Sequence, residues 1–251
     1  MRSARLGIVT FVLLTSACSV GPRETEPGPI VSHMLHDESK TWSVAIPQLA
    51  PRTGTVTDAL MTKVREMNDW LRRDADRFKA AAEDLFDCLG DPPEYGCDAF
   101  TGPWNPRVRR HLVADSIEGD GLVVIRFTGF DDFLGNHPVV TSFSRAFDAS
   151  TGDEIRLADV LDRDDLRNIE ATATEAIFDA IGYEFTDSDW ISEGLGNIES
   201  YATWWPTPEG LRVIFADYAV AAHAAGTPEI VIPWSEFAVD DVRRLGGSPS
   251  S

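Results

Sequence analysis

The sequence predicts an α+β fold with a mainly antiparallel sheet and helices packed on one face. Short segments that alternate apolar and polar residues are joined by turn sequences, as expected of hairpins. Residues 57–88 and 162–181 carry apolar side chains at helical spacing. Strands and helices do not follow a regular strand–helix–strand order, which argues against a doubly wound parallel sheet.

The first half of the globular chain predicts a strand, a long helix and a hairpin. Alternation in Thr41–Leu49 indicates the strand. Residues 57–88 have one apolar and one charged helical face, which favours packing on a core over lining a cofactor pocket. Arg107–Ile117 and Leu122–Phe127 alternate as strands around a Glu-Gly-Asp-Gly turn at 118–121.

The second half predicts a strand, a helix and a second hairpin. His137–Phe147 alternates as a strand, and the helix over 162–181 ends at Gly182. Within the segment 201–237, two β-forming stretches flank a Thr-Pro-Glu-Gly turn at 207–210, which predicts an antiparallel pair.

A small-residue corner follows that hairpin and ends at Gly226. Glu229–Ile232 is a short apolar stretch that predicts a third strand. We expect a final amphipathic helix through about Leu245, with Ser235 as its N-cap.

The N-terminal residues are typical of an export signal. Arg2 and Arg5 precede the apolar run Leu6–Leu14, and small residues precede Cys18. A run this short cannot cross a hydrocarbon core that needs about 20 helical residues, so a retained transmembrane anchor is the weaker interpretation.

The small residues before Cys18 predict lipoprotein processing. Residues 1–18 would be the signal peptide ending at the lipidated Cys18, whose acyl chains hold the protein on the membrane's outer face. Simple cleavage and secretion stay open as the alternative. Residues 19–39, which begin with a Pro- and Glu-rich stretch, are predicted to be a flexible tether.

We divide the rest into an N-terminal α+β subdomain with the long helix (40–130), a C-terminal domain (131–246) and a tail (247–251). Cys88 and Cys97 flank a loop-forming Leu-Gly-Asp-Pro-Pro-Glu-Tyr-Gly stretch, and export places them where a disulfide persists. Their spacing is not Cys-x-x-Cys and no histidine lies nearby, which disfavours a redox or metal pair.

Composition narrows the classes of partner. The chain is 43% hydrophobic, enough for a proper core, and its formal charge is −19, or −21 without Arg2 and Arg5. Such a field repels nucleic acid and anionic lipid surfaces and attracts a strongly cationic partner. The simpler interpretation is that acidity keeps an exported protein soluble.

Two motifs resemble a known family. The hairpin, corner and strand of 201–237 resemble the domain of unknown function in the extracellular half of RsiV-type anti-sigma factors and beside the deacetylase of PdaC-type peptidoglycan enzymes. His137-Pro138 and the Asp148, Thr151, Gly152 turn match the same family. The resemblance covers roughly residues 40–245, includes the small partner domain that usually precedes this family, and matches the layout of secreted antigens of Gram-positive bacteria.

No catalytic motif is present. There is no Gly-x-Ser-x-Gly, the five histidines are scattered rather than set as His-Glu-x-x-His, and 41 acidic residues make any glycosidase-like pair uninformative. We predict no catalytic residue, metal or cofactor. The nearest metal candidate is Asp131, Asp132 and His137, which a solvated turn beside a strand explains equally well.

The candidate ligand surface comprises Trp204, Trp205, Tyr218 and His223, around the hairpin and corner. These side chains, with Trp190, could stack on sugars or on a protein loop. Because neighbouring strand residues face opposite ways, one of Trp204 and Trp205 must face inward.

These observations favour a noncatalytic cell-envelope lipoprotein that binds an extracellular ligand. The resemblance implies recognition of lysozyme, so a basic lysozyme-like protein or peptidoglycan is the expected partner. Only five residues precede the apolar run, so we expect no cytoplasmic anti-sigma segment. The alternative is an envelope hydrolase, esterase or glycan-acting, with a site that the sequence does not reveal.

Overall fold

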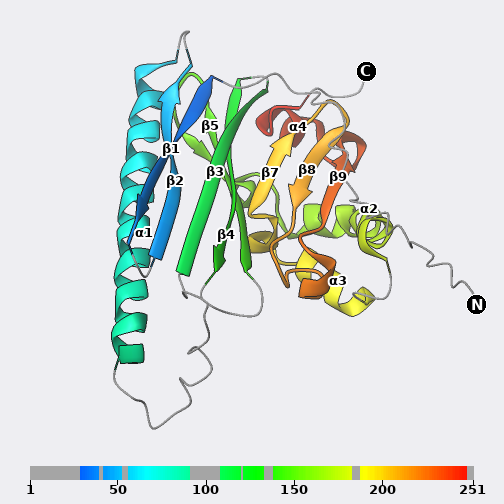
Figure 1. Ribbon diagram of the computed structural model, residues 1–251. Coiled ribbons are helices and arrows are strands. Elements are labelled where there is room, and N and C mark those ends of the chain that lie inside the picture. Colours follow the sequence, from blue (N-terminus) through cyan, green and yellow to red (C-terminus); the bar gives the residue numbers. More distant parts are fainter. Residues whose placement is uncertain are drawn as a thin grey trace, which may run out of the picture.

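The computed structural model describes residues 29–39, 42–52, 56–90, 108–119, 121–132, 138–182 and 187–247. A six-stranded sheet and a three-stranded sheet organise them. Figure 1 shows the long helix α1 (Asp58–Gly90) beside the larger sheet, and α2 (Arg163–Ile181), α3 (Ser188–Leu195) and α4 (Val239–Arg244) around the smaller one. The α+β class with a mainly antiparallel sheet is confirmed, with the strands divided between two sheets.

The larger sheet keeps its strands in chain order. They are β1 (Ile30–Glu38), β2 (Trp42–Pro51), β3 (Val108–Gly119), β4 (Leu122–Asp132), β5 (Val139–Asp148) and β6 (Glu154–Ile155). Every neighbouring pair is antiparallel except β2 and β3, which run parallel. A parallel pair needs a long crossover connection, and α1 lies within it.

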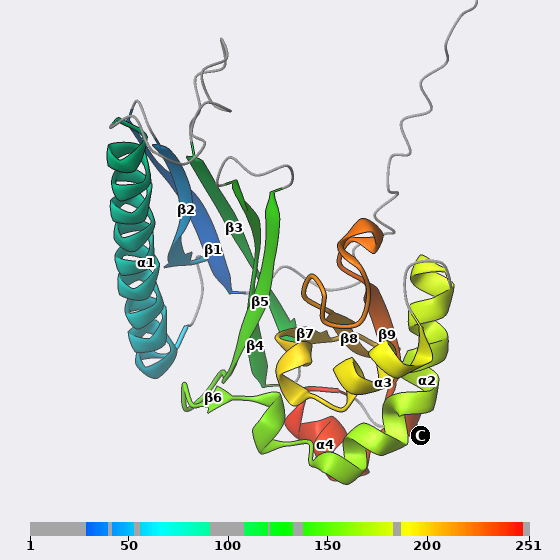
Figure 2. The same ribbon diagram turned by 90° about the horizontal axis from the view of Figure 1, so that it is seen from below.

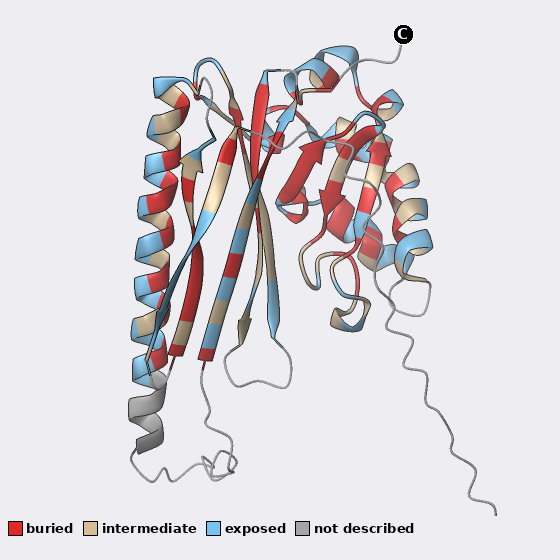
Figure 3. Cartoon of the chain, turned by 45° about the horizontal axis from the view of Figure 1, so that its top comes forward, coloured by how far each residue is buried: buried red, intermediate tan, exposed pale blue. Residues whose placement is uncertain are grey.

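Helix α1 covers one face of this sheet, as its amphipathic pattern predicts. Its buried residues recur every three or four positions and face the strands, while the outward side is exposed (Figure 3). One polar residue lies in this face: Asn68 accepts a hydrogen bond from the Leu49 amide at 2.8 Å and donates to the Leu49 carbonyl at 2.9 Å. Both polar ends of the buried amide are therefore satisfied.

The predicted β3–β4 hairpin is present. Its register pairs Gly119 with Leu122, which leaves a two-residue turn. Gly121 has a φ of 73°, a conformation that such turns require and that glycine adopts without steric cost.

Strand β1 corrects the predicted tether over 19–39, because residues 30–38 pair with β2 along their whole length. Ser116 Oγ accepts a hydrogen bond from the Ile30 amide at 3.1 Å and donates to the Ile30 carbonyl at 2.5 Å. Most β1 side chains are exposed, so its sequence lacks the apolar signal of a half-buried strand.

The smaller sheet contains β7 (Thr203–Pro206), β8 (Gly210–Ile214) and β9 (Glu229–Pro233), all antiparallel. It shares a buried apolar core with α2 and α3. Helix α2 ends before Gly182, as predicted, and Gly182 has a φ of 81°. At its start, Asp162 caps the helix in a reciprocal capping box with Asp165, which the sequence had not indicated.

The two sheets meet where β5 passes β7. The Ser144 amide donates to the Ala202 carbonyl at 2.9 Å, and the Trp204 amide donates to Ser144 Oγ at 2.8 Å. Figure 2 shows α1 and the smaller sheet on opposite sides of the larger sheet. The domain boundary predicted after residue 130 falls inside β4, whose pairing with β5 continues across it.

The final helix differs from the prediction. Trp234–Glu236 is a 3-10 turn, Phe237 is extended, and α4 starts after Ala238, so Ser235 is not an N-cap. The cause is the Trp234 side chain, which is buried and donates from Nε1 to the Thr207 carbonyl at 2.9 Å. Helix α3, which has no counterpart among the predicted elements, is capped by Asp187.

Several predictions concern parts of the chain outside the described residues. They are the signal sequence, Cys18, His137 and the Cys88–Cys97 disulfide, since neither Cys97 nor the Cys88 side chain is described. Within the described ranges, no helix combines the length and apolar character needed to span a membrane.

Candidate functional site

The candidate site is the corner that joins β8 to β9, residues 217–226. A hydrogen bond from the Phe215 amide to the Pro228 carbonyl, at 2.9 Å, joins the two ends of the corner. A 3-10 turn, His223–Ala225, precedes Gly226, whose φ of 76° ends the corner as predicted.

Helix α3 supports the corner from one side. A β-carbon at Gly194 would lie 2.2 Å from the Ala219 carbonyl oxygen and 2.7 Å from Val220 Cγ1, so only glycine permits this approach. On the same helix, Trp190 Nε1 donates to the Tyr218 carbonyl at 3.2 Å. The sequence placed Trp190 among the aromatic candidates, and the structure brings it to the corner.

Asp217 and His223 form a short polar pair at the corner. His223 Nδ1 lies 2.5 Å from Asp217 Oδ2, and the Asp217 side chain is only 10% exposed. Among the described residues, the second carboxylate oxygen, Oδ1, is buried and has no hydrogen-bond partner. Leaving a buried acceptor unsatisfied costs about 1–3 kcal/mol, and more for a charged group.

Tyr218 is held in an uncommon conformation. Its φ of 64° is the one positive value among the non-glycine residues that the structure describes. Left-handed backbone costs a bulky residue about 1–2 kcal/mol. The residue is 61% exposed, and its ring stacks on His223, with centroids 5.7 Å apart and planes at 20°. Residues held in sparsely populated backbone conformations cluster at active sites and ligand clamps.

Two of the four predicted surface residues do not reach the surface. Trp204 and Trp205 are each 4% exposed, so both face inward, where strand alternation required at least one to do so. Trp205 lies in a strand buried on both faces, with the Arg126 guanidinium 4.4 Å and the Arg212 guanidinium 5.9 Å from its ring centroid. Of the four, Tyr218 is therefore exposed and the His223 side chain is 30% exposed.

The corner lies within an acidic segment, residues 168–242. This stretch contains fourteen Asp and Glu residues and a single basic residue, Arg212, a formal charge of −13 out of the chain's −19. Arg212 is bound to Glu229 at 2.6 Å. The segment includes most of α2, all of α3, the smaller sheet and the corner.

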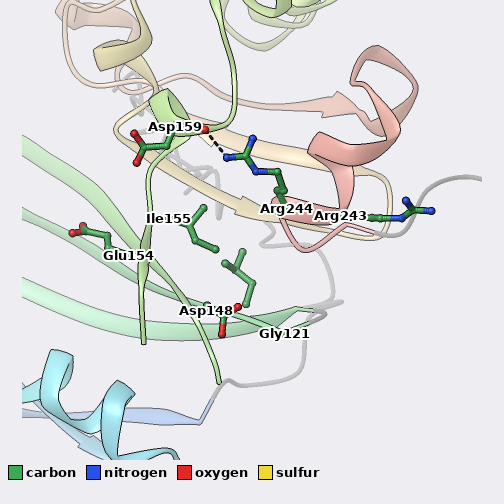
Figure 4. A pocket seen from close by; sticks show the side chains of 8 residues that line it. Gly121, Asp148, Glu154, Ile155, Asp159, Arg243 and Arg244 are labelled. Atoms are coloured by element: carbon green, nitrogen blue, oxygen red, sulfur yellow. Dashed lines mark hydrogen bonds between the residues drawn. The ribbon is translucent and has the colours of Figure 1, made fainter. Parts of the chain in front are cut away.

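A cavity of about 290 Å³ lies elsewhere, between the β3–β4 turn, the 148–155 turn and the arginines of α4 (Figure 4). Its charged groups are largely engaged within the protein. Arg244 Nη2 donates to the Asp159 carbonyl at 2.5 Å, and Glu154 accepts two hydrogen bonds from Arg145 at 2.8 Å. Arg145 also holds the pKa of Glu154 below its usual value.

The Asp148, Thr151, Gly152 motif beside this cavity has a structural role. Asp148 Oδ1 accepts hydrogen bonds from the Ser150 hydroxyl and from the amides of Ser150 and Thr151, which lowers the pKa of Asp148. Gly152 has a φ of 73° and packs so closely on Ala59 that a β-carbon would lie 2.8 Å from its carbonyl carbon. The motif therefore fixes a turn against the start of α1.

The metal alternative gains no support from Asp131, which forms a two-bond ion pair with Arg110 at 2.8 and 2.5 Å. Over the described ranges, no group of three or more His, Cys, Asp or Glu side chains could hold a metal ion.

Residues 158–235 match a family model, DUF3298, described as a protein of unknown function. The chain contains a DUF3298 family domain. The match includes α2, α3, the β7–β8 hairpin and the whole corner, so the candidate site lies inside the DUF3298 domain.

Two crystal structures of DUF3298 family proteins share the fold. One, from Pseudomonas aeruginosa, has a TM-score of 0.51 and 15% identity and covers 86% of this chain and 94% of its own. The other, from Bacteroides fragilis, has a TM-score of 0.53 and 12% identity over 90% of this chain and 95% of its own. The likeness therefore extends well beyond the DUF3298 domain. No curated protein sequence matches this chain.

Proposed function

We propose that this chain is a noncatalytic, lipid-anchored protein of the cell envelope that binds a basic extracellular protein. The carrying observation is the acidic segment 168–242, in which one paired arginine accompanies fourteen carboxylates. A single-sign field of this kind raises the association rate of an oppositely charged partner by about 10- to 1,000-fold. The charge of the segment sets the association rate and the choice of partner, while the affinity comes mainly from contacts at the interface.

A lysozyme-like protein is the preferred partner. Lysozymes are commonly basic, and RsiV-type proteins, which the 201–237 segment resembles, recognise lysozyme outside the cell. Peptidoglycan is the other candidate, but its glycan strands offer the acidic segment no comparable cationic surface. The protein would act as a decoy, inhibitor or surface receptor, held at the membrane by acyl chains on Cys18.

A titration with hen egg-white lysozyme tests this function. We expect saturable binding at low ionic strength that weakens steadily as salt rises towards about 1 M, where the Debye length falls to about 3 Å. Cytochrome c, another basic protein, is the control for nonspecific charge attraction. Absence of saturable lysozyme binding at low salt, or equal binding of cytochrome c, contradicts lysozyme-like recognition.

An envelope hydrolase remains the second candidate because of the Asp217–His223 pair. A carboxylate bound to histidine Nδ1 is the arrangement that orients a catalytic base. The test is hydrolysis of ester and glycan substrates by the wild type and by His223→Ala. Activity that survives the substitution comes from a contaminant or another site and removes this candidate.

A further inference from the structure

We propose that the corner binds a cationic side chain, a guanidinium or ammonium group, presented by the basic partner. The site consists of Asp217, Tyr218, His223 and Trp190. This inference rests on the proposed function, because it names the point at which the acidic protein anchors its partner.

Asp217 supplies the charge and an available acceptor. Its side chain is nine-tenths buried, and His223 occupies Oδ2, while Oδ1 lacks a hydrogen-bond partner among the described residues. A buried carboxylate oxygen in this state gains a strong, charge-assisted hydrogen bond from any N–H cation that reaches it. The ligand must therefore be a donor and should be positively charged.

Tyr218 supplies the face on which that cation rests. Its ring is largely exposed, stands next to Asp217 in the chain and is backed by the parallel imidazole of His223. A cation within about 6 Å of an aromatic face is attracted by the ring's electron distribution. Helix α3 contacts the backbone beneath the ring, because the Trp190 indole donates to the Tyr218 carbonyl.

The protein itself offers few competing cations here. Arg212 is the single Arg or Lys in residues 168–242, and it is bound to Glu229. By contrast, the carboxylates of Asp131, Asp115 and Glu154 in the larger sheet each pair with an arginine. Among the described residues, Asp217 thus differs from these three acids in having no arginine or lysine partner.

Entry of the cation needs a small displacement of the corner, since Oδ1 is shielded from solvent. The segment that must move includes the strained Tyr218 backbone. Relaxing the strained Tyr218 backbone offsets part of the free energy needed to open the corner. Tyr218 therefore both contacts the cation through its ring and makes Asp217 Oδ1 easier to reach.

The first experiment measures lysozyme affinity for the full chain and two variants with the same charge change. Asp217→Asn removes the buried charge and should weaken binding by about 10-fold or more. Glu66→Gln changes an exposed residue on α1, beyond the larger sheet, and should change affinity by less than about twofold. Circular dichroism verifies that both variants are folded.

The second experiment uses arginine amide as the probe and reads the indole N–H signal of Trp190, assigned with Trp190→Phe, during an NMR titration. We expect a saturable shift in the wild type and none in Asp217→Asn. Glycine amide, which lacks the guanidinium, should produce no shift.

The outcomes separate the two proposals. If lysozyme binds but Asp217→Asn and Glu66→Gln behave alike, the proposed function stands and the cation site is refuted. If lysozyme does not bind but arginine amide shifts Trp190 in an Asp217-dependent way, the cation site stands and the lysozyme-like partner is refuted. If arginine amide leaves Trp190 unchanged in the wild type, the cation site is refuted whatever lysozyme does.

Discussion

The strain at Tyr218 predicts that glycine and alanine substitutions there affect stability differently. Both remove the ring of a residue that is 61% exposed, so both lose little buried area. Alanine still has a β-carbon that disfavours the left-handed φ of 64°, whereas glycine adopts it freely. We therefore expect Tyr218→Gly to be more stable than Tyr218→Ala by about 1 kcal/mol, because the added chain freedom of glycine offsets part of the strain cost of about 1–2 kcal/mol.

Urea unfolding followed by circular dichroism measures this difference. Ala224 provides the control, because it is exposed, lies in the same corner and is not among the described residues with positive φ. Ala224→Gly should lower stability by up to about 1 kcal/mol, the usual effect of added chain freedom. If Tyr218→Gly is no more stable than Tyr218→Ala, the backbone strain and its part in opening the site are both refuted.

Three further substitutions test the framework. Ser116→Ala should cost about 1–3 kcal/mol and speed hydrogen exchange at Ile30, because the serine hydroxyl satisfies both backbone groups of that residue; unchanged exchange refutes this anchor. Gly194→Ala should destabilise the fold by about 2 kcal/mol or more and weaken lysozyme binding, since its β-carbon would displace α3 from the corner; a neutral effect contradicts the close approach. Arg145 lowers the pKa of Glu154, so the stability that the ionised Glu154 side chain gives the fold is present above the usual pKa of 4.5. This stability is lost as pH falls through the lower pKa of the folded state. Wild type and Glu154→Gln should therefore converge in stability below that range, and a constant difference down to low pH refutes the Arg145 effect.

The sequence predicts best where local chemistry and packing agree. The α1 stripe, the β3–β4 turn at Gly121 and the capped helix α2 follow from apolar spacing, turn residues and caps. Strand β1 could not be predicted in the same way, because its side chains are mostly exposed and Ser116, far along the chain, anchors its first residue.

The candidate site was predicted only in part. Tyr218 and His223 were selected as exposed polar aromatics beside a turn, but alternation cannot show that β7 is buried on both faces, which removes Trp204 and Trp205. Asp217 was missed because one aspartate among 41 acidic residues carries no distinguishing signal. A short small-residue corner after a strand, with Asp and His six positions apart, is the signal that could have selected it.

The prediction to be tested first is that this acidic protein, which contains a DUF3298 family domain, binds a basic partner. Calorimetric titration of the chain with hen egg-white lysozyme, repeated from about 0.01 M to about 1 M salt, tests it most directly. We expect saturable binding that is tight at low salt, weakens steeply as screening increases and is not matched by cytochrome c. No saturable heat at the lowest salt, or an affinity that salt does not change, contradicts it.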